Sequence, residues 1–98
     1  MRVVWTSRSL RHLASIGTFL EARNPGAATR TVEAIRDKVE ALQGNPLQGR
    51  VGRNPGTREL VITGTSYIVV YRPRRDRLDI IAVMHGARLW PKRFTNCA

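Results

Sequence analysis

The sequence predicts an α+β fold in which one strand precedes two helices and three further strands, in the order β-α-α-β-β-β. Apolar residues recur every three to four positions between residues 7 and 43, which is typical of amphipathic helices. After residue 56 they alternate at a period close to two, and Gly and Pro separate short segments rich in β-formers. The links between these segments are short, so the strands run antiparallel. We therefore expect a helical hairpin packed across one face of a mainly antiparallel four-stranded sheet.

The N-terminal part predicts a strand at residues 3–5 and then a first helix. Thr6 or Ser7 can begin this helix, because a side-chain hydroxyl can accept from an N–H group of the first turn. Gly17 lies inside the helix, where it suggests close contact with a second helix. The positions expected to face the core follow helical spacing and are Leu10, Leu13, Ala14, Gly17 and Leu20.

A second helix is predicted to follow directly and to pair with the first as a hairpin. Asn24 is a favourable N-cap, and Pro25 at the first helical position would lose no hydrogen bond there. Gly44 and Pro46 end the pattern. The apolar stripe of this helix consists of Ala28, Val32, Ile35, Val39 and Leu42.

Three strands are predicted in the second half of the chain, at residues 57–62, 67–72 and 78–85. The connections at residues 64–66 and 73–77 are rich in turn-forming residues. The predicted domain spans residues 1–98 as a single unit, with residues 91–98 as a C-terminal tail.

The charge of the chain indicates an anionic partner. Seventeen Lys and Arg residues stand against seven Asp and Glu, a net charge of +10, and fifteen of the seventeen are Arg. Arginine favours bidentate contacts with carboxylates and phosphates. A single cysteine, Cys97, excludes an internal disulfide and a cysteine-based metal site. No apolar run approaches the roughly 18 residues of a membrane helix, and the start lacks a secretion signal, so we expect a cytoplasmic protein without membrane, metal or cofactor.

Three motifs give the chain a resemblance to a known family. They are Thr-Arg-Glu-Leu at residues 57–60, Tyr-Ile-Val-Val-Tyr-Arg at 67–72 and His-Gly-Ala-Arg at 85–88. Together with the order of elements, they resemble the RelE/ParE superfamily, the small toxins of bacterial type II toxin–antitoxin modules. The likeness covers about residues 1–90.

The resemblance implies a toxin that forms a hetero-oligomer with a cognate acidic antitoxin, with contact to DNA only through that antitoxin. RelE-like members cut mRNA on the ribosome, whereas ParE-like members poison DNA gyrase. One fold therefore carries two activities and cannot choose between them. Two further classes stay open, a simple nucleic-acid-binding module and a member that binds an antitoxin but has lost its toxicity.

Metal-free RNA cleavage would require groups that move protons and stabilise charge on the phosphate. Arg58, Arg72 and Arg88 could hold a phosphate, and His85 or Tyr71 could transfer a proton. These five residues are the candidate catalytic set of the nuclease alternative.

A general base for that reaction is hard to find. Residues 43–57 contain no Lys and no carboxylate, whereas RelE-like toxins place lysines or a glutamate before or within the second strand. Glu59 is the nearest acid, and it could simply pair with a neighbouring arginine. Arginine itself is a poor base at neutral pH. The sequence thus favours the ParE-like interpretation, inhibition of gyrase by binding.

Binding roles are predicted for two sets of residues. The set expected to contact the target is Arg58, His85, Arg88, Trp90, Lys92 and Arg93. The set expected to contact the antitoxin is Leu10, Leu13, Leu20, Val32, Ile35 and Arg72. Simpler structural roles stay open for several residues. His85 could make a structural hydrogen bond, Tyr67 and Tyr71 could pack at the edge of the core, and Arg58 or Arg88 could form an ion pair.

Overall fold

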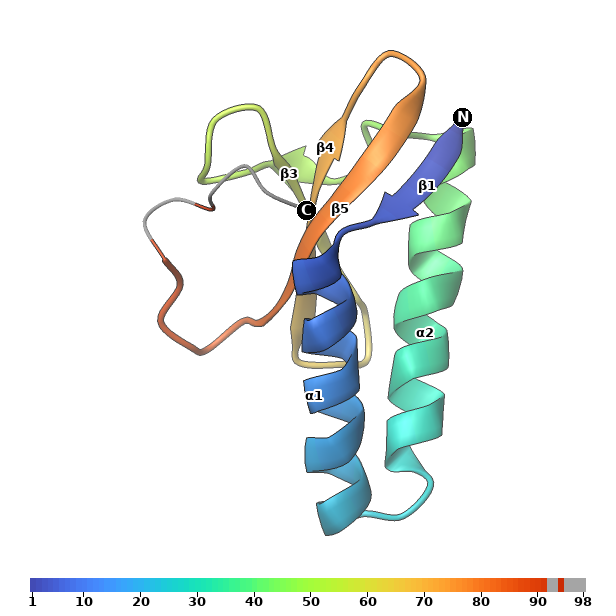
Figure 1. The fold of residues 1–98 in the computed structure, drawn as a ribbon, viewed down its shortest axis with the longest axis vertical. Coiled ribbons are helices and arrows are strands. Elements are labelled where there is room, and N and C mark those ends of the chain that lie inside the picture. The colour runs from blue at the N-terminus through green and yellow to red at the C-terminus, as the bar shows by residue number, and fades with distance from the viewer. Residues whose placement is uncertain (92–93, 95–98) are drawn as a thin grey trace.

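The computed structural model describes residues 1–91 and Phe94. The predicted fold class and order of elements are confirmed, and the sheet has the order β1-β5-β4-β3-β2 (Figure 1). Strand β1 runs parallel to β5, and the other neighbours are antiparallel. The elements are β1 (Arg2–Trp5), α1 (Ser7–Arg23), α2 (Ala27–Ala41), a 3-10 turn (Leu42–Gly44), β2 (Arg50–Val51), β3 (Arg58–Val61), β4 (Tyr67–Pro73) and β5 (Arg77–His85).

The sheet has five strands rather than the predicted four. The additional strand, β2, contains only two residues, which pair with Glu59 and Arg58 of β3. Two residues are too few to produce an alternating apolar pattern, so the sequence gives no strand signal there.

The start of α1 is fixed to the sheet by polar contacts. Thr6 is the N-cap, as predicted, and its Oγ1 accepts from Ser9 N at 3.1 Å. The same hydroxyl donates to Ile80 O at 2.7 Å, and Thr6 N donates to this carbonyl at 3.1 Å. One turn further along α1, His12 Nδ1 accepts from Val83 N of β5 at 3.1 Å. Residues at the start of α1 therefore form hydrogen bonds with backbone groups of β5 that lie beyond the end of β1.

The connection between the helices differs from the prediction. Asn24 is the C-cap of α1, with its N–H bonded to Leu20 O at 2.8 Å. The N-cap of α2 is Gly26, whose φ of 91° lies in the left-handed region that favours glycine. Pro25 thus lies in the turn before α2 and does not begin the helix. The assignments of Asn24 and Pro25 to the start of the second helix were wrong.

The buried side of α1 is also rotated from the predicted stripe. Ser9, Leu13 and Ile16 are buried, whereas the Leu10 side chain is 46% exposed. The contacts of Thr6 and Ser9 at the first turn set this rotation. A Cβ at Gly17 would meet nothing within 4 Å, so the predicted close helix contact at this residue was wrong.

The main core lies between the two helices and the sheet (Figure 1). One additional residue in β5, Ile81, stands between the partners of Val70 and Tyr71. This bulge lets both Ile80 and Val83 contribute to the helix-facing core, although they are three residues apart. The buried core consists of Leu13, Ile16, Ile35, Val39, Leu42, Leu60, Ile62, Tyr67, Val69, Tyr71, Leu78, Ile80 and Val83.

A smaller apolar cluster lies on the opposite face of the sheet, which carries no helix. Val70, Ala82 and Trp90 are its buried members, and Phe94 is among the residues packed against them. The chain after β5 supplies Trp90 and Phe94 and so covers part of this face. No helix in residues 1–91 is long and apolar enough to cross a membrane.

Candidate functional site

A pocket of about 320 Å³ lies where both helices meet the end of β5 and the β3–β4 turn. Two of the predicted target-binding residues, His85 and Arg88, lie in it together. Its lining consists of Phe19, Leu20, Thr31, Thr65, Ser66, Tyr67, His85 and Arg88. We refer to it as the β5-end pocket.

A tight turn after β5 brings His85 and Arg88 to this pocket. Arg88 N donates to His85 O at 3.1 Å, and Ala87 N donates to His85 Nδ1 at 3.1 Å. The His85 ring meets the Tyr67 ring edge-on, with the centroids 5.5 Å apart. Because Nδ1 accepts a hydrogen bond, Nε2 is the imidazole nitrogen that can donate to a bound group.

The lining of the β5-end pocket contains no carboxylate. Arg88 supplies an exposed guanidinium, whose carbon lies 6.0 Å from the centre of the Phe19 ring. Thr31 and Ser66 add hydroxyl groups to the rim. This combination of a cation, an imidazole and hydroxyl donors suits an anionic or carbonyl-bearing group of a partner.

The structure does not bring the five candidate nuclease residues together. Tyr71 is fully buried on the helix-facing side, where its hydroxyl donates to Pro46 O at 2.7 Å and accepts from Gly49 N at 2.9 Å. Burial raises the pKa of this phenol above its ordinary value. Arg58 Nη1 donates to Gly49 O at 2.8 Å and to Leu47 O at 3.2 Å. Both side chains therefore hold the loop before β2.

Gly49 is required at the centre of this arrangement. A Cβ there would lie 2.8 Å from Tyr71 Cε1 and 2.9 Å from Glu59 O, closer than real side chains approach. The close approach explains why a glycine stands in this loop.

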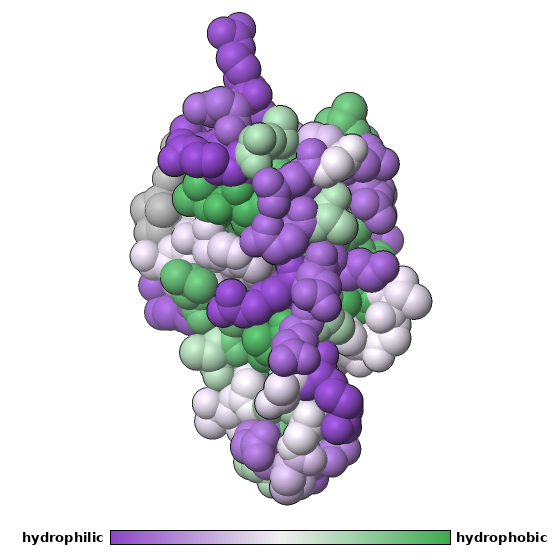
Figure 2. Space-filling model, turned by 90° about the vertical axis from the view of Figure 1, so that its right-hand side faces the viewer, coloured by the Kyte–Doolittle hydropathy of each residue, from purple (hydrophilic) through white to green (hydrophobic). Residues whose placement is uncertain are grey.

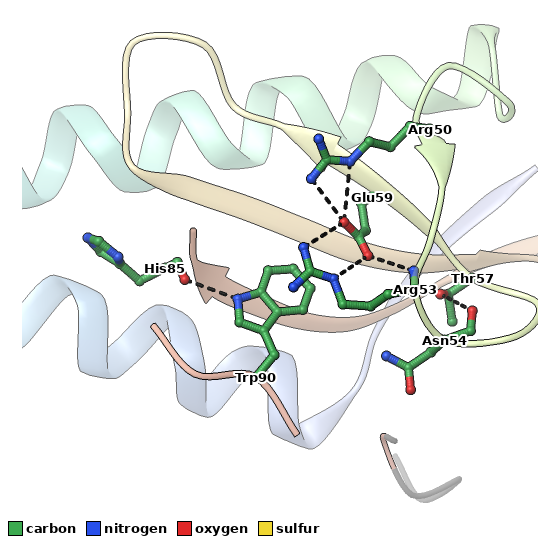
Figure 3. Close-up of polar contacts among 7 residues, drawn as sticks. All are labelled: Arg50, Arg53, Asn54, Thr57, Glu59, His85 and Trp90. Atoms are coloured by element: carbon green, nitrogen blue, oxygen red, sulfur yellow. Dashed lines mark hydrogen bonds and ion pairs between the residues drawn. The ribbon is translucent and has the colours of Figure 1, made fainter. Parts of the chain in front are cut away.

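Glu59, the nearest acid in the sequence, is enclosed by two arginines on the other face of the sheet (Figure 3). Its side chain is 3% exposed and lies 3.0 Å from both Arg50 Nη2 and Arg53 Nε. Arg53 N also donates to Glu59 Oε2 at 2.9 Å. Burial alone would raise the pKa of this carboxyl, but the hydrogen bonds from Arg53 and Arg50 hold it below its ordinary value. A carboxylate stabilised in this way is a weak base.

Trp90 was predicted to contact the target, and the structure turns it inward instead. Trp90 is 8% exposed, and its Nε1 donates to His85 O at 3.2 Å. The Arg53 guanidinium carbon lies 3.6 Å from the centre of the indole ring (Figure 3). Trp90 therefore anchors the chain after β5 to the sheet. The predicted contacts Lys92 and Arg93 lie outside the described residues.

The predicted antitoxin contacts divide between the surface and the core. Leu13 and Ile35 are 5% and 0% exposed and fill the space between the helices and the sheet, so their assignment as contacts was wrong. Leu10 is exposed, and Val32 lines an open groove along α2 of about 460 Å³. On the α2 side of the molecule, hydrophobic patches stand between hydrophilic side chains (Figure 2). Leu20 packs against the core and also lines the β5-end pocket.

One further predicted residue and two residues that were not predicted line pockets of the molecule. Arg72, predicted to contact the antitoxin, lines a separate pocket with Asn54. Phe19 and Thr31 belong to the β5-end pocket but were not predicted. An aromatic residue outside the apolar stripe was a usable signal for Phe19, whereas nothing distinguishes Thr31 in the sequence. Among the described residues no group of three His, Cys, Asp or Glu side chains could hold a metal ion.

This fold, a helical hairpin over a mainly antiparallel sheet, is the one expected for the RelE/ParE superfamily. Residues 3–90 match the ParE toxin of type II toxin–antitoxin system, parDE, and the chain belongs to this family. It is 45% identical over 91 residues to "Putative toxin Y4kP" of Sinorhizobium fredii (strain NBRC 101917 / NGR234), covering 93% of this chain and 94% of that protein.

A solved structure shares the fold. The structure titled "Chromosomal ParDE TA system from P. aeruginosa" superposes with a TM-score of 0.81 at 24% sequence identity. The match covers 87% of this chain and 95% of that chain. At this identity the similarity shows a common fold.

Proposed function

We propose that this chain is the toxin of a type II toxin–antitoxin module, that it inhibits DNA gyrase by binding, and that a cognate acidic antitoxin neutralises it. The observation that carries the proposal is the match to the ParE toxin family over residues 3–90, which includes His85 and Arg88. Gyrase acts in the bacterial cytoplasm, so the proposal places the toxin there.

The arrangement of side chains favours binding over RNA cleavage. A metal-free nuclease needs a base and an acid close to one phosphate. Tyr71 is buried against the loop before β2, and Glu59 is held by two arginines. Arg72 and His85 line different pockets. These placements leave His85 and Arg88 as a pair suited to holding a partner group.

The β5-end pocket is the proposed contact with gyrase. Arg88 would bind a carboxylate or a backbone carbonyl of the target, and His85 Nε2 would donate a second hydrogen bond. Leu89, next to Arg88, is 97% exposed and would supply an apolar contact beside the cation. An arginine beside an apolar anchor is a common composition for the centre of a protein interface.

The antitoxin is proposed to cover the outer side of the helices. Leu10 and Val32 offer apolar contacts there, and Arg36 lines the same α2 groove as Val32. With a net charge of +10, the chain would attract an acidic segment over a distance. We expect the association rate constant of the two proteins to fall markedly with salt, and a rate independent of salt would contradict this electrostatic account.

Two assays on the purified chain test the target. One measures supercoiling by purified gyrase, and the other measures cleavage of mRNA translated by ribosomes. The proposal predicts reduced supercoiling or accumulated cleaved DNA, intact mRNA, and restored supercoiling after addition of the antitoxin. Position-specific mRNA cuts with normal supercoiling would instead establish the RelE-like activity.

A further inference from the structure

A second pocket, of about 300 Å³, has no part in the proposed function. It lies beside the turn between β2 and β3, and Phe94 from the chain after β5 reaches it. Its lining consists of Asn54, Pro55, Thr57, Arg72 and Phe94. We refer to it as the Asn54 pocket.

Hydrogen bonds fix the backbone of Asn54, but its side-chain amide forms none with the described residues. Its backbone carbonyl accepts from Thr57 Oγ1 at 2.6 Å and from Thr57 N at 3.1 Å, which fixes the turn (Figure 3). The residue is 4% exposed, and neither Nδ2 nor Oδ1 has a hydrogen-bond partner among the described residues. In Figure 3 no contact joins this amide to Glu59 or Arg53. A buried donor and acceptor without partners is unfavourable unless water or a ligand pairs with them.

Arg72 supplies a cation that no carboxylate neutralises within the described residues. Its Nη2 has one long contact, 3.4 Å to Pro55 O. Its cross-strand neighbour, Asp79, is bound instead by Arg74 at 3.1 Å and Arg77 at 2.8 Å. The guanidinium of Arg72 is therefore available to bind an anion beside Asn54.

Phe94 adds an aromatic ring to the same pocket. It is half-buried, and the guanidinium carbon of Arg8 lies 5.2 Å from its ring centre. An aromatic ring, an amide with a free donor and a free acceptor, and an unneutralised arginine therefore line one small space.

We propose that the Asn54 pocket binds a nucleotide. The Asn54 amide would pair with the base edge, since adjacent donor and acceptor groups on a base match the amide of an asparagine. Arg72 would bind the phosphate, and the base would lie against Phe94, a contact that tolerates any base. An acidic peptide could also reach Arg72. It would neither need the aromatic ring nor fill a pocket of about 300 Å³ with a single side chain.

Titration of the purified full-length chain with AMP, followed by calorimetry, tests the proposal. Saturable binding at one site is expected. Adenosine lacks the contact with Arg72 and should bind about tenfold more weakly than AMP. Inorganic phosphate lacks the contacts with Asn54 and Phe94 and should bind about fiftyfold more weakly. Asn54→Ala and Arg72→Gln should each weaken AMP binding about tenfold, and Phe94→Leu about fivefold.

Arg75→Gln is the matched control, since it removes the same charge from an exposed turn. It should change AMP binding less than about twofold. Circular dichroism checks that Asn54→Ala is folded, which we expect because the side chain makes no hydrogen bond to any described residue. Absence of saturable AMP binding, or equal losses in Arg72→Gln and Arg75→Gln, would overturn the proposal. Tighter binding of a capped Asp-Asp peptide than of AMP would also overturn it and identify an acidic-peptide site.

Discussion

The two faces of the sheet are built in different ways. The helix-facing side is a continuous apolar core in which Ile35, Val39 and Leu42 are fully buried. The opposite side has a small apolar cluster and a polar arrangement in which Glu59 holds Arg50 and Arg53. The stability of the first face comes from hydrophobic burial, on which pH has little effect. The stability of the second face comes from charges and hydrogen bonds, which pH and salt change directly.

This difference separates the parts that maintain the fold from the parts that are free to bind. The paired helices bury Leu13, Ile16, Ile35 and Val39 and leave the β5-end pocket at the edge of the core. On the opposite face, in the Asn54 pocket, lie an arginine that pairs with no carboxylate of the described residues and a buried amide without a partner among them. We therefore expect the largest stability effects from the first face. We expect pH-dependent effects where a titratable side chain is hydrogen-bonded, as Glu59 is on the second face and His12 is on α1.

Ile35→Ala should give the largest loss of stability. Truncation of a fully buried isoleucine typically costs about 2–5 kcal/mol, because the cavity closes only in part. Denaturant unfolding measures the change. Val61→Ala, at a residue that is 49% exposed, is the control and should stay within about 0.5 kcal/mol of the wild type. Similar losses in both variants would mean that the helix-facing core is not the main source of stability.

Glu59→Gln should lower the free energy of unfolding by about 1–2 kcal/mol at neutral pH. This loss is small for a buried charge, because the side chains of both arginines are about half exposed. The folded-state pKa of Glu59 is depressed, so its contribution is present above about pH 4.5 and is lost as the pH falls through the folded value. The difference between variant and wild type should therefore shrink below about pH 4.5. A difference that does not change with pH would contradict the ion-pair assignment.

His12 should make stability depend on pH in a higher window. Burial, followed by the charges of Arg8 and Arg11, lowers the pKa of His12, and its Nδ1 must stay unprotonated to accept from Val83 N. Stability is thus full above about pH 6.5 and falls by about 1 kcal/mol as the pH drops through the folded pKa. His12→Gln should remove this slope in unfolding measured between pH 5 and 7. A slope that survives the substitution must come from another group.

Trp90→Phe should have the smallest effect, a loss of about 0.5–1 kcal/mol. The variant keeps an aromatic ring for Arg53 but loses the hydrogen bond from Nε1 to His85 O. Trp90→Ala, which removes the ring as well, should cost more in the same thermal-unfolding experiment. Equal effects of the two variants would show that the ring contact contributes little.

Periodicity and turn residues were sufficient to predict most of the fold. Two helices and the strands β1, β3, β4 and β5 were predicted from apolar spacing and β-forming residues, and Thr6 was one of two hydroxyl residues predicted to cap α1. Strand β2 was missed because two residues carry no period. The rotation of α1 was missed because tertiary hydrogen bonds from Thr6 to β5 set it, and local sequence does not contain them.

Some residues of the candidate site could be named from the sequence, although their roles stay a prediction. The resemblance to a family identified His85 and Arg88, which the structure places in one pocket. It also grouped Arg58 and Tyr71 with them, although both side chains hold a loop on another part of the molecule. Only a three-dimensional structure distinguishes an arginine that binds its own backbone from one that is free.

The most direct test compares Arg88→Gln with Arg75→Gln as inhibitors of gyrase supercoiling. Both substitutions remove one exposed positive charge, but only Arg88 lines the β5-end pocket. If this pocket contacts gyrase, Arg88→Gln should need about tenfold more protein for the same inhibition, whereas Arg75→Gln stays within about twofold of the wild type. Equal potency of the two variants would contradict the assignment of the β5-end pocket as the gyrase contact.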